Sequence, residues 1–337
     1  MKQTMWIGVV SIGVLASMLI SLSLGRYEIS LSSLMELLMW KGFGGVAPND
    51  VALLSNIVFD IRLPRIICVV LVGAALSVSG GAFQAMFVNP LVSPGILGVL
   101  AGASFGAALG IMISKHWFGV QFFAFIFGFI AVFVALGVAK LYDKNSSKTI
   151  LLVLGGVISS SLFSALLSVI KFMADPYDKL PTIVYWLMGS FSAVDMKMVV
   201  SIVLPMLLST VTLSMMGKYL NVMSLGDDDA KALGIRVVWI RYGAIFLATL
   251  LSTLTVVAAG MIGWVGLIIP HIARFMVGAD NRILLPFCAL LGALFLMIVD
   301  TLCRTVMSIE IPIGIVTSLI GIPIFIMALR SAKKGFA

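Results

Sequence analysis

The sequence predicts an all-α membrane protein that crosses the bilayer about ten times. Of its 337 residues, 61% are hydrophobic and only 11% are charged, and the mean hydropathy is +1.18. A soluble domain carries roughly a quarter charged residues. Apolar runs long enough to span a bilayer, which takes about 20 residues, follow one another with only short polar breaks. We therefore expect a single transmembrane domain over residues 1–337.

Ten apolar stretches are predicted to be membrane helices. They cover residues 5–24, 63–87, 96–113, 117–139, 150–170, 198–216, 242–259, 260–277, 283–301 and 311–329. The first run is long for a signal peptide and has no convincing cleavage site before Arg26, so we expect it to be retained. No charge separates the seventh stretch from the eighth, but Gly260, Gly263 and Gly266 favour a break between them.

The distribution of charge predicts that both termini lie in the cytoplasm. With that orientation, the cytoplasmic loops hold 13 of the 22 lysines and arginines but only five acids. The opposite face is then neutral. Because lysine and arginine accumulate in short cytoplasmic loops, this orientation is the favoured one.

Three polar connections are long enough to hold more than a turn. The first, 25–60, is expected outside the membrane and contains an amphipathic stretch at 31–40. The second is expected to form an external or re-entrant helix at 183–194, because it is rich in aromatic residues but too short to span. The third, 217–241, is expected in the cytoplasm and contains a short helix that begins at three aspartates and stops at Gly234. A solvated connector is the alternative interpretation of that helix.

Charged residues gather near the external ends of two predicted helices. Arg62 and Arg65 begin the second helix, against the charge bias of that face. Interfacial snorkelling and docking of an acidic partner both explain them. Asp300 and Arg304 lie four residues apart, with Glu310 nearby, which predicts an ion pair on one helical face.

Few residues suggest chemistry performed by the chain itself. The cysteines Cys68, Cys288 and Cys303 share no metal-like spacing, and His116 and His271 are far apart, so we expect no resident metal. Neither an HExxH motif nor a GxxxxGK[ST] loop occurs, so we expect no enzyme and no nucleotide site. An ion-coupled secondary transporter is an alternative from another class, although the spans hold few titratable groups.

Motifs in a fixed order resemble the BtuC/FecCD family of type II ABC importer permeases. Between about residues 58 and 330 they are RLPR, GAALSVSG, Gln84 with NPLVSP, LGVLAGA, WLMGSF, LGDDDAKALG, GMIGWVGLIIPHIAR and IPIGIVTSLIGIPIF. Trp264 departs from the phenylalanine that is common in the family. The resemblance implies a ten-helix subunit of the bacterial inner membrane that pairs with a second copy of itself. It also implies two ATP-binding subunits, which bind ATP and magnesium, and a periplasmic substrate-binding protein; no cofactor in this chain and no nucleic-acid partner are expected.

The resemblance assigns roles to three groups of residues. The segment that would couple to the ATPase comprises Leu225, Gly226, Asp227, Asp228, Asp229, Ala230, Lys231, Leu233 and Gly234. Within it, the side chains of Leu225, Ala230 and Leu233 are expected to enter a cleft on the ATPase. Docking of the binding protein would use Arg62, Arg65 and Arg304. The cytoplasmic gate of the pathway would comprise Asn89, Pro90, Leu91, Lys148, Thr149 and Ile150.

The resemblance also gives a substrate class without selecting one substrate. Members of the family import ferric siderophores, haem, cobalamin and, in one branch, molybdate and tungstate. The whole chain resembles the molybdate and tungstate branch, so we expect that cargo, with the other substrates as alternatives. A neutral pathway lined by small residues and methyl groups would tolerate either a small oxyanion or a large chelate.

Overall fold

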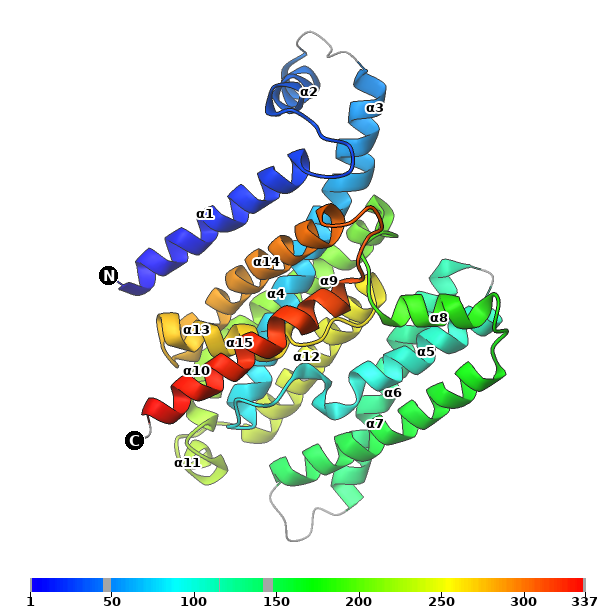
Figure 1. The fold of residues 1–337 in the computed structure, drawn as a ribbon. Coiled ribbons are helices and arrows are strands. Elements are labelled where there is room, and N and C mark those ends of the chain that lie inside the picture. The colour runs from blue at the N-terminus through cyan, green and yellow to red at the C-terminus, as the bar shows by residue number, and fades with distance from the viewer. Residues whose placement is uncertain (1, 45–49, 115, 142–147, 336–337) are drawn as a thin grey trace.

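The computed structural model describes residues 2–44, 50–114, 116–141 and 148–335, and these ranges fold almost entirely into helices (Figure 1). Side chains are described throughout them, except for Lys148 and residues 328–335. Within this part of the chain, seven helical segments are long and apolar enough to cross a membrane, and three shorter apolar helices accompany them. The prediction of an all-α membrane protein with about ten spans is confirmed.

The apolar helices follow the predicted stretches closely. They are α1 (Lys2–Ser23), α4 (Leu63–Met86), α5 (Val99–Ile113), α6 (Trp117–Leu141), α7 (Lys148–Met173), α9 (Met196–Met215), α12 (Val237–Ala259), α13 (Val265–Val277), α14 (Asn281–Thr305) and α15 (Ile313–Gly335). The predicted break between the seventh and eighth spans is present, since α12 ends at Ala259. Gly260 then takes a φ of +69°, which a residue with a side chain rarely adopts.

Helix α4 forms the centre of the molecule and is buried along most of its length. It packs against α14, α12, α13 and α9, whereas α5, α6 and α7 form a second group beside it (Figure 1). Glycines allow the closest approaches, because a side chain on Gly73 would collide with the backbone of Gly292, and one on Gly80 with that of Gly266. Such contacts between small residues are typical of helix packing inside membranes.

The connection at 25–60 forms a small helical unit at one end of the molecule (Figure 1). The amphipathic stretch is helix α2 (Leu31–Phe43), which buries Leu34 and Leu37 against Leu54 and Val58. Leu54 belongs to α3 (Val51–Ser55), which continues through the π-helical turn η1 (Asn56–Arg62) into α4. Residues 45–49 lie outside the described ranges.

The helix expected at 183–194 lies earlier in the chain, as α8 (Lys179–Leu187). It ends there because Gly189 takes a φ of +77° and the backbone then bonds to other elements. The amide of Ser190 donates to the carbonyl of Ala259 at 2.9 Å, and that of Ile313 donates to the carbonyl of Gly189 at 3.0 Å. The segment after α8 therefore joins the end of α12 to the start of α15.

The start of α1 and the end of α15 lie at the end of the molecule opposite α2 (Figure 1). The Gln3 side chain donates to the carbonyl of Val277 at 2.8 Å, which places the start of α1 beside the end of α13. Asp280, three residues further on, accepts a hydrogen bond from Asn221 at 2.6 Å, so the third polar connection lies there too. The end of α15 reaches the same side (Figure 1).

Candidate functional site

The third polar connection folds into two short helices, α10 (Gly217–Met223) and α11 (Asp227–Ala232), as Figure 1 shows. Helix α11 ends in a tight closure in which Gly234 takes a φ of +78°. The amide of Gly234 donates to the carbonyl of Lys231 at 2.9 Å, and the amide of Ile235 donates to that of Ala230 at 3.0 Å. This pair of bonds is the Schellman arrangement that satisfies the last carbonyls of a helix. The predicted short helix with a glycine stop is therefore present.

One ion pair holds α11 to a membrane helix, and a second one lies within α11 itself. Asp227 forms an ion pair with Arg241 of α12 at 2.5 Å, and Asp228 forms one with Lys231 at 2.9 Å. The hydrogen bond from the Lys231 ammonium to Asp228 raises the pKa of that lysine. Because Arg241 is almost fully buried, its pairing with Asp227 fixes the start of α11 against α12.

A second contact links α10 to the start of α14. Asp280 caps α14 and accepts hydrogen bonds from Arg282 at 2.6 Å and from Asn221 at 2.6 Å. These bonds, with that from Arg282 the strongest, hold the pKa of the Asp280 carboxyl well below its usual range. Asn221 also accepts from the backbone of Asn281 at 2.9 Å. The connection from α10 to α11 is thus bonded to both α12 and α14.

One expectation for this segment is wrong. Ala230 was expected to face the ATPase, but it is 0% exposed and belongs to the main core, where α11 packs against α10 and α12. Leu225 and Leu233 are each 61% exposed. Ala230 points inward because its position on the six-residue helix faces α10 and α12, which sequence spacing alone does not reveal. The large apolar side chains that this segment exposes are those of the two leucines.

The two segments of the predicted gate lie side by side. Asn89 and Pro90, from the turn after α4, line one open hollow with Thr149 and Ile150, from the first turn of α7. Asn89 accepts a hydrogen bond from the amide of Leu91 at 2.9 Å, which shapes the turn. Leu91 is exposed but does not line the hollow. The side chain of Lys148, which begins α7, lies outside the described residues.

A buried charge cluster occupies the other end of the molecule. Arg65 of α4 forms ion pairs with Asp300 of α14 at 2.8 Å and with Glu310 at 2.6 Å. Arg304 pairs with the second oxygen of Asp300 at 3.1 Å and donates to the hydroxyl of Ser21 at 2.5 Å. The predicted pair of Asp300 and Arg304 is therefore confirmed, and Arg65 and Glu310 enlarge it. Burial alone would raise the pKa of Glu310, but its hydrogen bonds from Arg65 outweigh burial and lower it.

Arg62 has a different role, because it binds backbone carbonyls. Its guanidinium, only 4% exposed as a residue, donates to the carbonyls of Leu22, Ser23 and Tyr27. The last carbonyls of a helix lack partners within the helix, so Arg62 closes the end of α1. All three arginines assigned to docking thus have partners inside the chain. Their docking role stays a prediction, and an arginine would have to exchange partners to perform it.

Two of these contacts could not be predicted from the sequence. Arg65 and Glu310 are 245 residues apart, and the sequence offers no signal that joins them. Arg241 and Asp227 are close in sequence, but several other basic residues lie equally close to this aspartate, so its partner cannot be selected from the sequence. The only sequence signal for either pair was the rarity of charge in so apolar a chain, which makes each buried charge expected to be paired.

Comparison with known proteins agrees with the geometry. Residues 13–331 match the FecCD transport family. The chain is 38% identical to the molybdate import system permease protein MolB of Haemophilus influenzae, an alignment that covers 94% of this chain and 92% of that protein. It is 33% identical to the vitamin B12 import system permease protein BtuC of Salmonella arizonae, with 98% and 96% covered.

A solved structure also matches over nearly its whole length. It is described as an inward-facing conformation of an ABC transporter of metal-chelate type, and it superimposes with a TM-score of 0.86 at 36% identity. The match covers 97% of this chain and 99% of that one. In this family the ATPase is a separate chain. The protein therefore belongs to the FecCD transport family and is an integral inner-membrane permease subunit of an ABC importer.

Proposed function

We propose that this permease carries a metal-containing substrate from the periplasm to the cytoplasm, and that molybdate or tungstate is the favoured cargo. The observation that supports the cargo is the 38% identity to a molybdate permease over almost the whole chain. A ferric siderophore, haem or cobalamin is the alternative, favoured by the likeness to a vitamin B12 permease and to a transporter of metal-chelate type.

The proposed assembly contains two copies of this chain, two ATP-binding subunits and one periplasmic binding protein. Both termini would face the cytoplasm with α11, and α2 would face the periplasm. The charge bias of the loops supports this orientation, because the end that holds the termini also holds most of the basic residues. ATP and magnesium would be bound by the partner ATPase and by no residue of this chain.

In this assembly, the exposed Leu225 and Leu233 would enter a cleft on the ATPase. Movement of the ATPase would then act on α11, whose ion pair from Asp227 to Arg241 leads to α12. Hydrogen bonds between Asn221 and Asp280 lead from α10 to α14 in the same way. Since α14 packs along α4, a shift of α14 would reach the proposed gate that follows α4.

An ion-coupled secondary transporter is less well supported. Such a transporter needs a titratable group inside the membrane that can release and bind its ion. The fully buried Asp300 lies near one end of α14 and is held by Arg65 and Arg304. Both oxygens of this carboxylate accept hydrogen bonds from arginines of the same chain, an arrangement that suits a structural role.

The proposed cargo can be tested with the binding protein, because that protein would bind the substrate before delivering it to this chain. The periplasmic binding protein of the same importer would be purified and titrated with molybdate, tungstate, a ferric siderophore, haem and cobalamin by calorimetry. Tight binding of molybdate and tungstate alone is the expected result. Binding of a siderophore, haem or cobalamin in their place would overturn the proposed cargo and leave the family assignment intact.

A further inference from the structure

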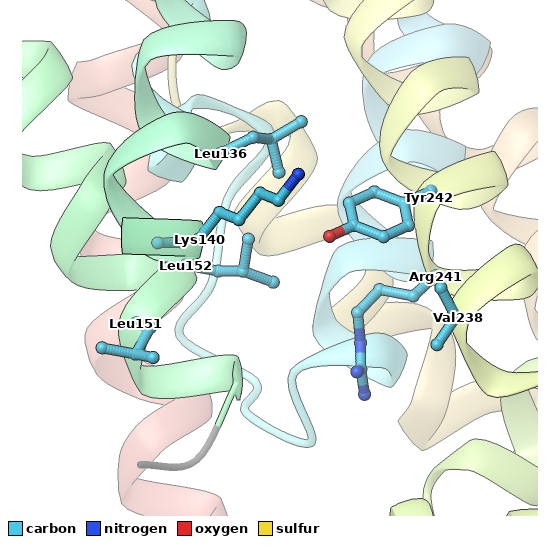
Figure 2. A pocket seen from close by; sticks show the side chains of 8 residues that line it. Leu136, Lys140, Leu151, Leu152, Val238, Arg241 and Tyr242 are labelled. Atoms are coloured by element: carbon cyan, nitrogen blue, oxygen red, sulfur yellow. The ribbon is translucent and has the colours of Figure 1, made fainter. Parts of the chain in front are cut away.

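A pocket between the ends of α6, α7 and α12 is unused by the proposed transport path (Figure 2). Its polar lining comes from Lys140, Arg241 and Tyr242, and its apolar lining includes Leu136 and Leu152. Figure 2 shows Lys140 reaching from α6 across the pocket toward the hydroxyl of Tyr242 on α12. Two cations and a hydroxyl therefore surround a space that is otherwise apolar.

The two cations of the pocket differ in whether they already form an ion pair. Arg241 is almost fully buried and is paired with Asp227 at 2.5 Å. Lys140 is exposed and forms no ion pair with any residue that the structure describes. Among the described residues that line the pocket, positive charge therefore exceeds negative charge, and the ammonium of Lys140 is the group available to an incoming anion.

The pocket lies near the ends of the membrane helices, at the level where lipid headgroups are expected. Lys140 stands in the last turn of the apolar helix α6, and Tyr242 stands in the second turn of α12. Trp239 and Phe246, which lie three residues before and four residues after Tyr242 on the same face of α12, are exposed aromatic residues as well. Tryptophan and tyrosine gather where hydrocarbon meets the headgroups. A ligand here would therefore have its charged group at headgroup level and its apolar part along the helices.

We propose that this pocket binds the phosphate of an anionic phospholipid. The Lys140 ammonium and the Tyr242 hydroxyl would donate to phosphate oxygens, and Leu136 and Leu152 would contact the glycerol and the first acyl carbons. Basic pockets between membrane helices are suited to such headgroups, and each basic residue near the surface contributes about 1 kcal/mol. A lipid, rather than free phosphate, fits the mixture of cationic and apolar lining.

Thermal unfolding of the purified full-length chain in neutral detergent tests the site. Phosphatidylglycerol, phosphatidylcholine and inorganic phosphate would be titrated separately into the wild type, Lys140→Gln and Lys218→Gln. Lys218 is an exposed lysine of α10 at the same end of the molecule, so its variant is the matched control. Arg241 is left intact because it anchors α11.

The expected result is saturable stabilisation by phosphatidylglycerol, with an apparent affinity about fivefold weaker in Lys140→Gln and unchanged in Lys218→Gln. Phosphatidylcholine should stabilise all three proteins equally and less. An equal response of the two variants to phosphatidylglycerol would overturn the site. Equal saturable stabilisation by inorganic phosphate would overturn the assignment to a lipid.

Discussion

The carboxylate of Asp300 is fully buried and accepts hydrogen bonds from two arginines. A buried ion pair itself adds little to the free energy of unfolding. Removing one partner, however, is strongly destabilising, because the other charge is left buried without compensation. Arg65 retains Glu310 if Asp300 is neutralised, whereas Arg304 retains only neutral oxygen partners. The cluster therefore joins α4, α14 and the connection before α15, and it depends on Asp300.

Asp300→Asn should destabilise the protein by about 3 kcal/mol, because it leaves buried arginine charge without a compensating carboxylate. Thermal unfolding in detergent would measure the loss. The control is Asp178→Asn, which breaks the exposed pair with Lys179 at 3.8 Å and should change stability by less than about 1 kcal/mol. Equal stability of the two variants would show that the cluster contributes little to the fold.

Glu310 competes with any external partner for Arg65, since it binds that guanidinium through both carboxylate oxygens. If Arg65 docks the binding protein, then Glu310→Gln should strengthen docking severalfold by releasing a charge-assisted bond. Surface plasmon resonance with the purified binding protein would measure this, with salt dependence as a second readout. Unchanged or weaker docking would argue that Arg65 serves only the fold.

At the scale of single elements, the features that depend on neighbouring residues are predictable from the sequence. The start of α11 at three aspartates and its stop at Gly234 depend on neighbouring residues, and both were predicted correctly. The inward direction of Ala230 depends on where α10 and α12 lie, so the expectation for this residue was wrong. The pair of Arg65 and Glu310 is a tertiary contact across the chain and was missed for the same reason.

The burial of Ala230 changes how the coupling role of α11 should be tested. Ala230→Arg would place a charge in the core and disturb the fold itself, so it cannot report on coupling alone. Leu233→Glu alters an exposed side chain and should leave folding intact. We expect it to weaken association with the ATPase and to lower ATP-driven uptake at least severalfold, because a charge replaces an apolar contact.

Pull-down of the ATPase and uptake in proteoliposomes would measure these effects, and thermal unfolding would confirm an intact fold. Lys218→Gln, on the neighbouring helix α10, is the control and should leave both functions unchanged. Normal ATPase association and normal uptake in Leu233→Glu would identify α11 as a connector only.

The gate segments after α4 and at the start of α7 should meet their copies across the dimer axis. Cysteines introduced at Leu91 or Thr149 are expected to cross-link between subunits in at least one nucleotide state. The native Cys68, Cys288 and Cys303 are all buried, so they should contribute little background. Non-reducing electrophoresis would detect the linked dimer. An intact dimer without cross-links in any state would remove both residues from the gate.

At the scale of the whole molecule, two long helices join the proposed sites at opposite ends. Helix α14 is capped at its start by Asp280, which is bonded to α10, and its last turns carry Asp300 of the charge cluster. Helix α4 begins beside the same cluster at Arg65 and leads into the turn of Asn89. The two helices pack together along the centre of the protein. This arrangement suits a subunit that couples docking of the binding protein at one face to ATP hydrolysis by the ATPase at the other.

The most direct test of this function is ATP-driven uptake by the reconstituted importer. Proteoliposomes would contain this chain and its ATPase, with the binding protein and labelled molybdate on the side of α2. We predict uptake that requires ATP, the ATPase and the binding protein, with no ATP hydrolysis by this chain alone. Uptake driven by an ion gradient without ATP, or specific ATP turnover by the isolated chain, would contradict the assignment as a permease subunit of an ABC importer.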